Sequence, residues 1–146
     1  MTVSFPVYLE PTQAAGRDLF LRGIEGPVVM LNLLRLRTVA DYSASPELAP
    51  AEPISGAAAF DRYIAHTRPF LAASGGEVLF LGAGGGLLIG PPDERWDLAM
   101  LVRQSGVAAF MAFADDPACM AGIGHRTAAV EDSRLLPLAP RDTRQV

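Results

Sequence analysis

The segment 122–137, GIGHRTAAVEDSRLLP, gathers ionisable side chains in a chain of which half the residues are hydrophobic. Five of its side chains can carry a charge: His125, Arg126, Glu131, Asp132 and Arg134. Buried charges need partners, whereas exposed charges form a polar rim. We expect at least one of the two carboxylates to neutralise one of the two arginines. In either arrangement the segment is the best candidate site in the chain.

His125 and Arg126 are the candidates for chemistry within this segment. A histidine accepts or releases a proton near neutral pH, and an arginine holds a carboxylate through two parallel hydrogen bonds. Gly122 and Gly124 place the pair in a turn before the last strand. The alternative is an ion pair between an arginine and an acidic neighbour that only fixes the strand end. The sequence leaves both interpretations open.

Asn32 interrupts the apolar run of a predicted strand at 27–37. A buried amide needs hydrogen-bond partners. We therefore expect its side chain to face a cavity or a satisfied polar cluster. There it either orients a carbonyl or hydroxyl group of a ligand or ties the strand to a loop. On the same strand, Arg35 is a further ligand-binding candidate.

Tyr63 and His66 lie three residues apart in a predicted helix and can share one face of it. If that face lines a cavity, Tyr63 contacts the ligand and His66 is a general base. The alternative is a partly exposed histidine at the edge of an amphipathic helix. Trp96 begins the alternating segment 96–102 and is another ligand-binding candidate.

Several chemistries are excluded by composition. The chain has no lysine, so Schiff-base catalysis by a lysine amine is impossible. Two histidines and the single Cys119, without short ligand spacing, give no zinc signature, and we expect no metal or other cofactor. GAGGG at 82–86 lacks the third glycine of a dinucleotide-binding loop, because Leu87 stands there. These glycines indicate a strand break or a bulge.

Hydrophobic periodicity and turn residues predict the order of elements. The expected helices are 11–22, 55–74 and 105–114, followed by a turn that starts at Asp116-Pro117. Thr12 should cap the first helix and Ser105 the third, and Pro69 should kink or shorten the second. The expected strands are 27–37, 77–83, 96–102 and 128–136. A helix followed by β-α-β-β-α-β predicts a ferredoxin-like α+β fold with an N-terminal helical extension.

One domain should span 1–146, with an N-terminal extension at 1–26 and a flexible tail at 139–146. The loop 38–55 carries three prolines and is either a functional lid or an inert surface loop. The ferredoxin-like order puts helices on one face of the sheet only. Because the strands alternate cleanly, we expect a second copy to cover the other face as a homodimer.

The net charge of −4 disfavours nucleic-acid binding. The longest apolar run is too short to span a bilayer, so we expect no membrane partner. The N-terminus lacks the basic and apolar regions of a secretory signal, and a cytoplasmic protein is expected.

Three separated motifs together resemble the DUF1330 family: PVVMLNLLRLR (27–37), SGAAAFDRYIAHT (55–67) and GIGHRTAAVEDSRLLP (122–137). The resemblance implies a dimeric α/β-barrel, in which two ferredoxin-like subunits pack sheet to sheet. Members of that superfamily include cofactor-free monooxygenases, haem-degrading enzymes, isomerases and ligand-binding proteins. The family itself implies no settled activity. Phe60 and Cys119 depart from it, since tyrosines are expected at both positions.

The expected function is that of an uncharacterised, cofactor-independent enzyme acting on a small, partly apolar, anionic substrate. Asn32 and Arg126 would orient that substrate, and His66 or His125 would move a proton. The alternative, from a different class, is a non-catalytic ligand-binding or structural homodimer.

Overall fold

Four antiparallel strands form one sheet in the order β2-β3-β1-β4. The computed structural model describes residues 6–145 of the chain. Its strands are β1 (Val28–Leu36), β2 (Glu77–Gly86), β3 (Arg95–Gln104) and β4 (Val130–Leu138). Its helices are α1 (Gln13–Leu21), α2 (Gly56–Ala73), α3 (Val107–Asp115), α4 (Pro117–Met120) and α5 (Ile123–Ala129), with single 3₁₀ turns at Pro46–Leu48 and Thr143–Gln145.

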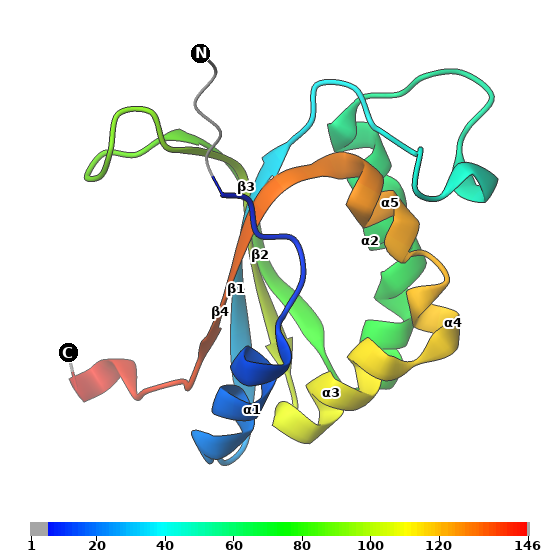
Figure 1. Ribbon diagram of the computed structural model, residues 1–146. Coiled ribbons are helices and arrows are strands. Elements are labelled where there is room, and N and C mark those ends of the chain that lie inside the picture. Colours follow the sequence, from blue (N-terminus) through cyan, green and yellow to red (C-terminus); the bar gives the residue numbers. More distant parts are fainter. Residues whose placement is uncertain (1–5, 146) are drawn as a thin grey trace.

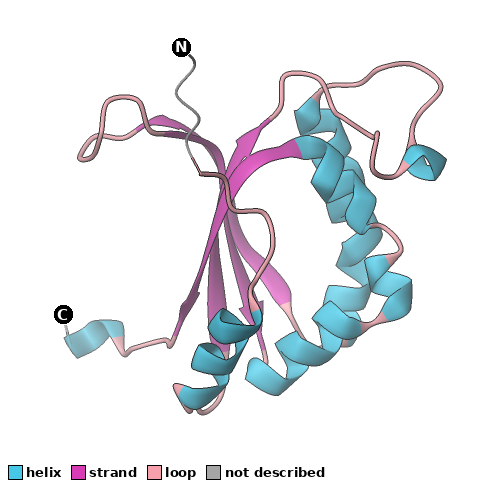
Figure 2. Ribbon diagram, viewed as in Figure 1, coloured by secondary structure: helices cyan, strands magenta, loops and turns pink. Residues whose placement is uncertain are grey.

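The helices from α2 to α5 lie on one side of the sheet, and α1 lies at its lower end (Figures 1 and 2). After α1, the order is β-α-β-β-α-β, with the second crossover divided among α3, α4 and α5. The strands β1 and β3 are central, and every neighbouring pair is antiparallel. The predicted ferredoxin-like α+β fold is therefore confirmed.

Alternating side chains of β1 make the core beneath the helices. Val28, Met30 and Leu34 are almost fully buried. Leu34 packs in one cluster with Phe60 of α2 and with Met100, Ala129 and Val130. The side chain of Phe60 is 2% exposed, so a phenylalanine ring suits this position, whereas a buried tyrosine hydroxyl group would need a hydrogen-bond partner.

Three helix starts predicted from the sequence are confirmed by hydrogen bonds from the capping side chains. Thr12 Oγ1 and Ser55 Oγ each accept from a backbone N–H three residues ahead, at 3.0 Å. Asp116 Oδ1 accepts from Ala118 N at 2.9 Å. Each bond satisfies a donor that the first helical turn leaves free.

The predicted cap at Ser105 is wrong. The N-cap of α3 is Gly106, and its helix begins at Val107. Ser105 Oγ donates instead to Ser74 O at 3.3 Å, across to the end of α2. A side chain that bonds a neighbouring segment is no longer free to cap its own helix.

Pro69 does not shorten α2, which continues to Ala73 and ends before Gly75, whose φ is 83°. Proline removes one bond, to the carbonyl of Ala65. Both residues are exposed, so water can hydrate that carbonyl.

The expected strand break at the glycines 84–86 is also wrong. Gly85 pairs with Trp96 and Gly86 with Arg95, so β2 continues through them. A Cβ atom at Gly84 would lie 2.3 Å from Trp96 O. Glycine is needed there because two backbones approach closely, and the bulge of β2 lies near Val78 instead.

The glycines before His125 do not form the expected turn, since His125 and Arg126 lie on α5. A Cβ atom at Gly122 would come within 2.2 Å of the His66 ring, and one at Gly124 within 2.5 Å of Ser45 Oγ. These glycines therefore make room for tight packing against α2 and the long loop. Because α5 continues to Ala129, β4 begins at Val130 and not at the expected residue 128.

The loop 38–55 is hydrogen-bonded across its own two ends and to the helix α5. Ala40 N donates to Ile54 O and Asp41 N to Ala128 O, both at 2.9 Å. Tyr42 and Ile54 pack against the main core cluster. The loop thus covers the upper end of the α2–α5 pair.

The sheet face opposite the helices, called the open face below, carries an apolar row across all four strands. The pairing aligns Phe80, Leu101, Leu31 and Leu136. Leu31 follows Met30, whose side chain is buried under the helices, and so points to the open face. Phe80 is 57% and Leu136 52% exposed.

No single described helix is long and apolar enough to cross a membrane. A bent pair, Val107–Asp115 with Pro117–Ala129, passes that test by length and composition.

Candidate functional site

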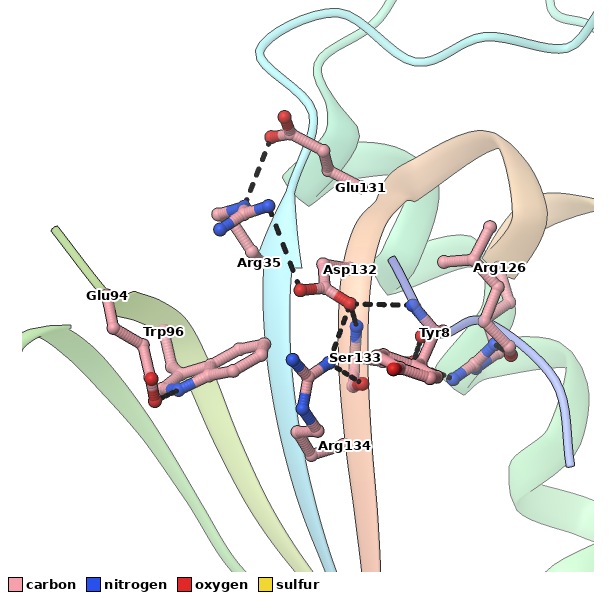
Figure 3. A network of polar contacts seen from close by, with 10 residues as sticks. Tyr8, Arg35, Glu94, Trp96, Arg126, Glu131, Asp132, Ser133 and Arg134 are labelled. Carbon is pink, nitrogen blue, oxygen red and sulfur yellow. Dashed lines mark hydrogen bonds and ion pairs between the residues drawn. The ribbon is translucent and has the colours of Figure 1, made fainter. Parts of the chain in front are cut away.

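An N-terminal strap, residues 6–11, runs along the outer edge of β4. Ser133 N donates to Tyr8 O at 3.0 Å, and Tyr8 N donates to Asp132 Oδ1 at 2.8 Å. The hydroxyl of Ser133 also donates to Tyr8 O. These bonds place the strap between two groups of charged side chains (Figure 3).

Arg126 projects from α5 toward the strap and β4. Its Nη1 donates to Leu9 O at 2.7 Å and its Nη2 to Ser133 Oγ at 3.2 Å. Among the described residues, no carboxylate lies within 4.0 Å of its guanidinium. Burial lowers the pKa of Arg126, while Tyr63 and then Glu10 act in the opposite direction. Arg126 is thus a partly buried cation whose hydrogen-bond partners are neutral.

Tyr63 of α2 lies beside this cation. Its ring packs against Phe60, with centroids 5.5 Å apart. Burial raises the pKa of Tyr63, although the charge of Arg126 opposes the rise. The phenol therefore stays protonated near neutral pH and is available as a hydrogen-bond donor.

Asn32 lies on the helix-facing side of β1, between the buried Met30 and Leu34. Its side chain is half-buried, and Nδ2 donates to Met30 O at 3.2 Å. The amide therefore faces the helices that carry Tyr63 and Arg126, but it makes no hydrogen bond to either side chain.

A second group of charges surrounds Asp132, whose side chain is 5% exposed. Arg134 Nη1 lies 2.7 Å from Asp132 Oδ1. Arg35 Nη2 lies 3.8 Å from Asp132 Oδ2, and Arg35 Nε lies 3.5 Å from Glu131 Oε2. The expectation that a carboxylate neutralises an arginine in this segment is met by the pair Asp132–Arg134 (Figure 3).

Two aromatic rings complete this group, which we call the Asp132 network. The guanidinium of Arg134 lies 4.8 Å from the Tyr8 ring centroid and 5.0 Å from that of Trp96. Trp96 Nε1 donates to Glu94 Oε2 at 3.0 Å. Arg35 and Trp96, both expected to contact a ligand, thus belong to the Asp132 network and not to the surroundings of Arg126.

Opposing effects act on the Asp132 carboxylate. Burial by itself would raise its pKa. The hydrogen bonds from Tyr8 N, Arg134 and Ser133 N outweigh burial and hold the pKa of Asp132 below its ordinary value. Asp132 is therefore ionised and balances its arginine neighbours at neutral pH.

The two histidines make their hydrogen bonds outside both of these groups. His125 Nδ1 lies 2.8 Å from Tyr42 Oη, and the two rings meet edge to face. His66 Nε2 lies 3.0 Å from Ala118 O. Burial, and then the charges of Arg62 and His66, lower the pKa of His125, so its ring is neutral at pH 7. His125 contacts the long loop, whereas its neighbour on α5, Arg126, points toward β4.

The structure therefore does not bring all predicted site residues together. Tyr63 and Arg126 are neighbours, and Asn32 faces the same layer. Two surface depressions lie elsewhere, one between α1 and α3 and one beside α2 and β2, and neither is lined by a predicted site residue. Within residues 6–145, no three metal-ligating side chains gather.

Sequence reasoning missed the strap residues that contact Arg126 and Asp132. Leu9 and Tyr8 contribute backbone carbonyls and an amide, and these groups carry no sequence signal. Ser133 belongs to the charged segment, but a lone serine between ionisable residues gave no reason to single it out.

Comparison with known proteins gives one clear relationship. No protein-family model and no curated protein matches this sequence. A crystal structure of methylated RPA0582 protein superposes with a TM-score of 0.82 and 36% identity, covering 94% of this chain and 97% of that chain.

A second crystal structure of RPA0582, described as a protein of unknown function from Rhodopseudomonas palustris, is also 36% identical. Its TM-score is 0.80, and the match covers 94% of this chain and 99% of that chain. At this identity over nearly the full length of both proteins, the chain belongs to the family of the RPA0582 protein.

Proposed function

We propose that the protein binds a small anionic molecule between its helix layer and its sheet, with Arg126 as the anchor for the anion. The observation that carries this proposal is the partly buried guanidinium of Arg126, whose hydrogen-bond partners within residues 6–145 are Leu9 O and Ser133 Oγ. A partly buried cation with no carboxylate of residues 6–145 within 4.0 Å favours an anion at that place. A carboxylate offers guanidinium stronger, charge-assisted hydrogen bonds than carbonyl and hydroxyl oxygens do.

Tyr63 and Asn32 supply the neutral contacts in this proposal. The protonated phenol of Tyr63 lies beside Arg126 and can donate to a ligand oxygen. The half-buried amide of Asn32 faces the helices and, within the part of the chain that the structure describes, makes one side-chain hydrogen bond, to its own strand. Apolar neighbours such as Phe60 and Leu34 favour a ligand with an apolar part.

Catalysis would require a proton carrier at this ligand. The predicted histidines are engaged elsewhere, His125 with Tyr42 and His66 with Ala118 O. Tyr63, whose pKa responds to the charge of Arg126, is the better candidate for a proton donor. Ligand binding is therefore proposed ahead of the cofactor-independent enzyme.

Titration with small carboxylates, from acetate to benzoate, tests the anchor when each is compared with its neutral amide. Arg126→Gln should weaken carboxylate binding at least about tenfold and leave amide binding nearly unchanged, because only the charge is lost. Arg68→Gln, an exposed arginine of α2, is the matched control. Equal losses for acids and amides, or carboxylate binding that Arg126→Gln leaves intact, would contradict the proposal.

We also propose that two copies pair through their open faces, and that the family of RPA0582 is DUF1330, on the three motifs given above. The apolar row of Phe80, Leu101, Leu31 and Leu136 supports the pairing, because a row of two exposed and two partly exposed apolar side chains on one face marks an interaction surface. A specific dimer should bury more than about 1,000 Å² in total.

Light scattering at micromolar concentration tests the dimer. Leu136→Asp, at a half-exposed position, should yield a folded monomer, since an unpaired charge in an apolar interface is costly. A monomeric unmodified protein would defeat this part of the proposal. The cytoplasmic location, and the lack of nucleic-acid and membrane partners, stay predictions from composition.

A further inference from the structure

The β2–β3 hairpin ends in a projecting apolar tip. Leu88 is 100% and Ile89 91% exposed, and Leu87 precedes them at 39%. Gly90 and Pro91-Pro92 follow, so the turn carries no charged side chain from 87 to 92. Three consecutive exposed aliphatic residues are costly at a protein surface, because apolar area is left in water.

An apolar groove lies at the other end of the molecule, between α1 and α3. Phe20 and Ile24 line one side of it, and Val107, Ala108 and Met111 line the other. Phe20 is 71% exposed and Met111 39%. The groove has a volume of about 870 Å³, which is ample for the three side chains of the tip.

The tip of a subunit cannot reach the groove of the same subunit. Figure 1 shows the hairpin at one end of the sheet, bent away from the helix layer, and α1 and α3 at the opposite end. The ten residues of β3 between them, Arg95–Gln104, separate the two ends by about 30 Å. The tip can therefore enter such a groove only on a different chain.

We propose that the hairpin tip, residues 87–89, of one subunit inserts into the α1–α3 groove of a second copy of this chain. The inference rests on the dimer proposed above and defines its two-fold axis. An axis in the interface plane and perpendicular to the strands reverses their direction and stacks β3 of one copy on β3 of the other. The tip before β3 then approaches the residues after β3, and the groove begins there, at Ser105.

The same axis makes the contact reciprocal. Each subunit inserts one tip and receives one, so the assembly closes as a dimer and does not grow into a fibre. The apolar row of the open face lies between the two contacts and joins them into one continuous interface. An axis parallel to the strands would instead bring the two tips to the same end, far from both grooves.

Polar substitution of the tip tests the insertion by sedimentation of the full chain. Leu88→Ser with Ile89→Ser should raise the dissociation constant of the dimer at least about tenfold, because two apolar side chains leave the interface. Val39→Ser is the matched control, since Val39 is 57% exposed on the long loop and belongs neither to the tip nor to the groove lining. An unchanged dissociation constant in the tip variant would overturn the inference.

Cysteine pairs test which groove receives the tip. In a Cys119→Ala background, Ile89→Cys together with Ala108→Cys should give a covalent dimer on oxidation. Ile89→Cys alone should stay uncross-linked, because the two tips lie at opposite ends of the dimer. Cross-linking by Ile89→Cys alone would place the tips together and overturn the inference.

These outcomes separate this inference from the dimer itself. If Leu136→Asp yields a monomer while the tip variant pairs normally, the open-face dimer stands and the insertion fails. Binding of the tip to vesicles of phosphatidylcholine and phosphatidylglycerol, lost in the tip variant while the dimer persists, would identify a membrane contact and overturn the insertion.

Discussion

Arg126 and Arg134 both lie beside the N-terminal strap, yet their surroundings differ. Arg134 contacts the carboxylate of Asp132 at 2.7 Å and stacks over two aromatic rings. Arg126 contacts a carbonyl and a hydroxyl group, and no carboxylate within residues 6–145 lies within 4.0 Å of it. Arg134 thus has a carboxylate in direct contact, whereas Arg126 has none among the described residues.

The difference separates a structural charge from a candidate binding charge. In the Asp132 network, donors from the strap, β4 and Arg134 converge on one nearly buried carboxylate, so the network holds the strap to the sheet. At Arg126, a negative charge supplied by a ligand could be neutralised by the guanidinium. Stability experiments should therefore respond to Asp132, and ligand experiments to Arg126.

The largest effect is expected from Asp132→Asn. The amide keeps the shape of the side chain but removes its charge and opposes the donors at Oδ1 with its own N–H groups. We expect a loss of about 2–4 kcal/mol in the free energy of unfolding. Urea denaturation measures it, with Asp142→Asn as control, because the pair Asp142–Arg144 is exposed and should contribute little.

A loss for Asp132→Asn no larger than for its control would show that the network does not hold the strap. Stability would then not distinguish the two arginines, since Arg134 would have no more of a stabilising role than Arg126.

Lowering the pH should reduce the stability of the protein through the same carboxylate, by less than Asp132→Asn does. Because the folded-state pKa of Asp132 lies below its ordinary value, the stability it contributes is complete above the unfolded pKa of about 3.9 and is lost as the pH falls through the folded value. Between pH 5 and 2.5, the melting temperature of the unmodified protein should fall more steeply than that of Asp132→Asn. Parallel curves for the two proteins would show that Asp132 has no depressed pKa.

The smallest effect is expected from Tyr63→Phe, which sharpens the assignment at Arg126. Loss of one neutral hydrogen bond should weaken carboxylate binding about two- to fivefold, or about 0.5–1 kcal/mol, with little change in stability. Calorimetric titration with benzoate measures the first and a thermal melt the second. A large loss of stability with unchanged benzoate binding would make Tyr63 a core residue only.

Local sequence signals predicted the elements well where the deciding interactions are local. Thr12, Ser55 and Asp116 cap helices because each side chain reaches a backbone N–H within three residues. The apolar run of 27–37 predicted the strand Val28–Leu36, which is central because both its neighbours pair with it. The predictions drawn from glycines were wrong where the glycine allows a close approach of segments distant in sequence. Gly84 faces β3, and Gly122 faces the His66 ring.

The candidate site was predictable in its residue types but not in its grouping. The density of charge at 125–134 pointed to Arg126, yet adjacent residues of a helix project about 100° apart. His125 therefore meets Tyr42 of the loop, while Arg126 meets Leu9 of the strap. Both partners are more than 80 residues away in the chain, and one contributes only a carbonyl oxygen.

The sequence by itself determined the α+β class, the order of the elements and the central strand, because periodicity, caps and turn residues act over a few positions. Only the tertiary structure decided which charges are balanced. Asp132 and Arg134 are two residues apart and form a pair, but the strap that completes their network begins more than 120 residues earlier. Whether a charge is satisfied depends on long-range packing, and no local pattern encodes it.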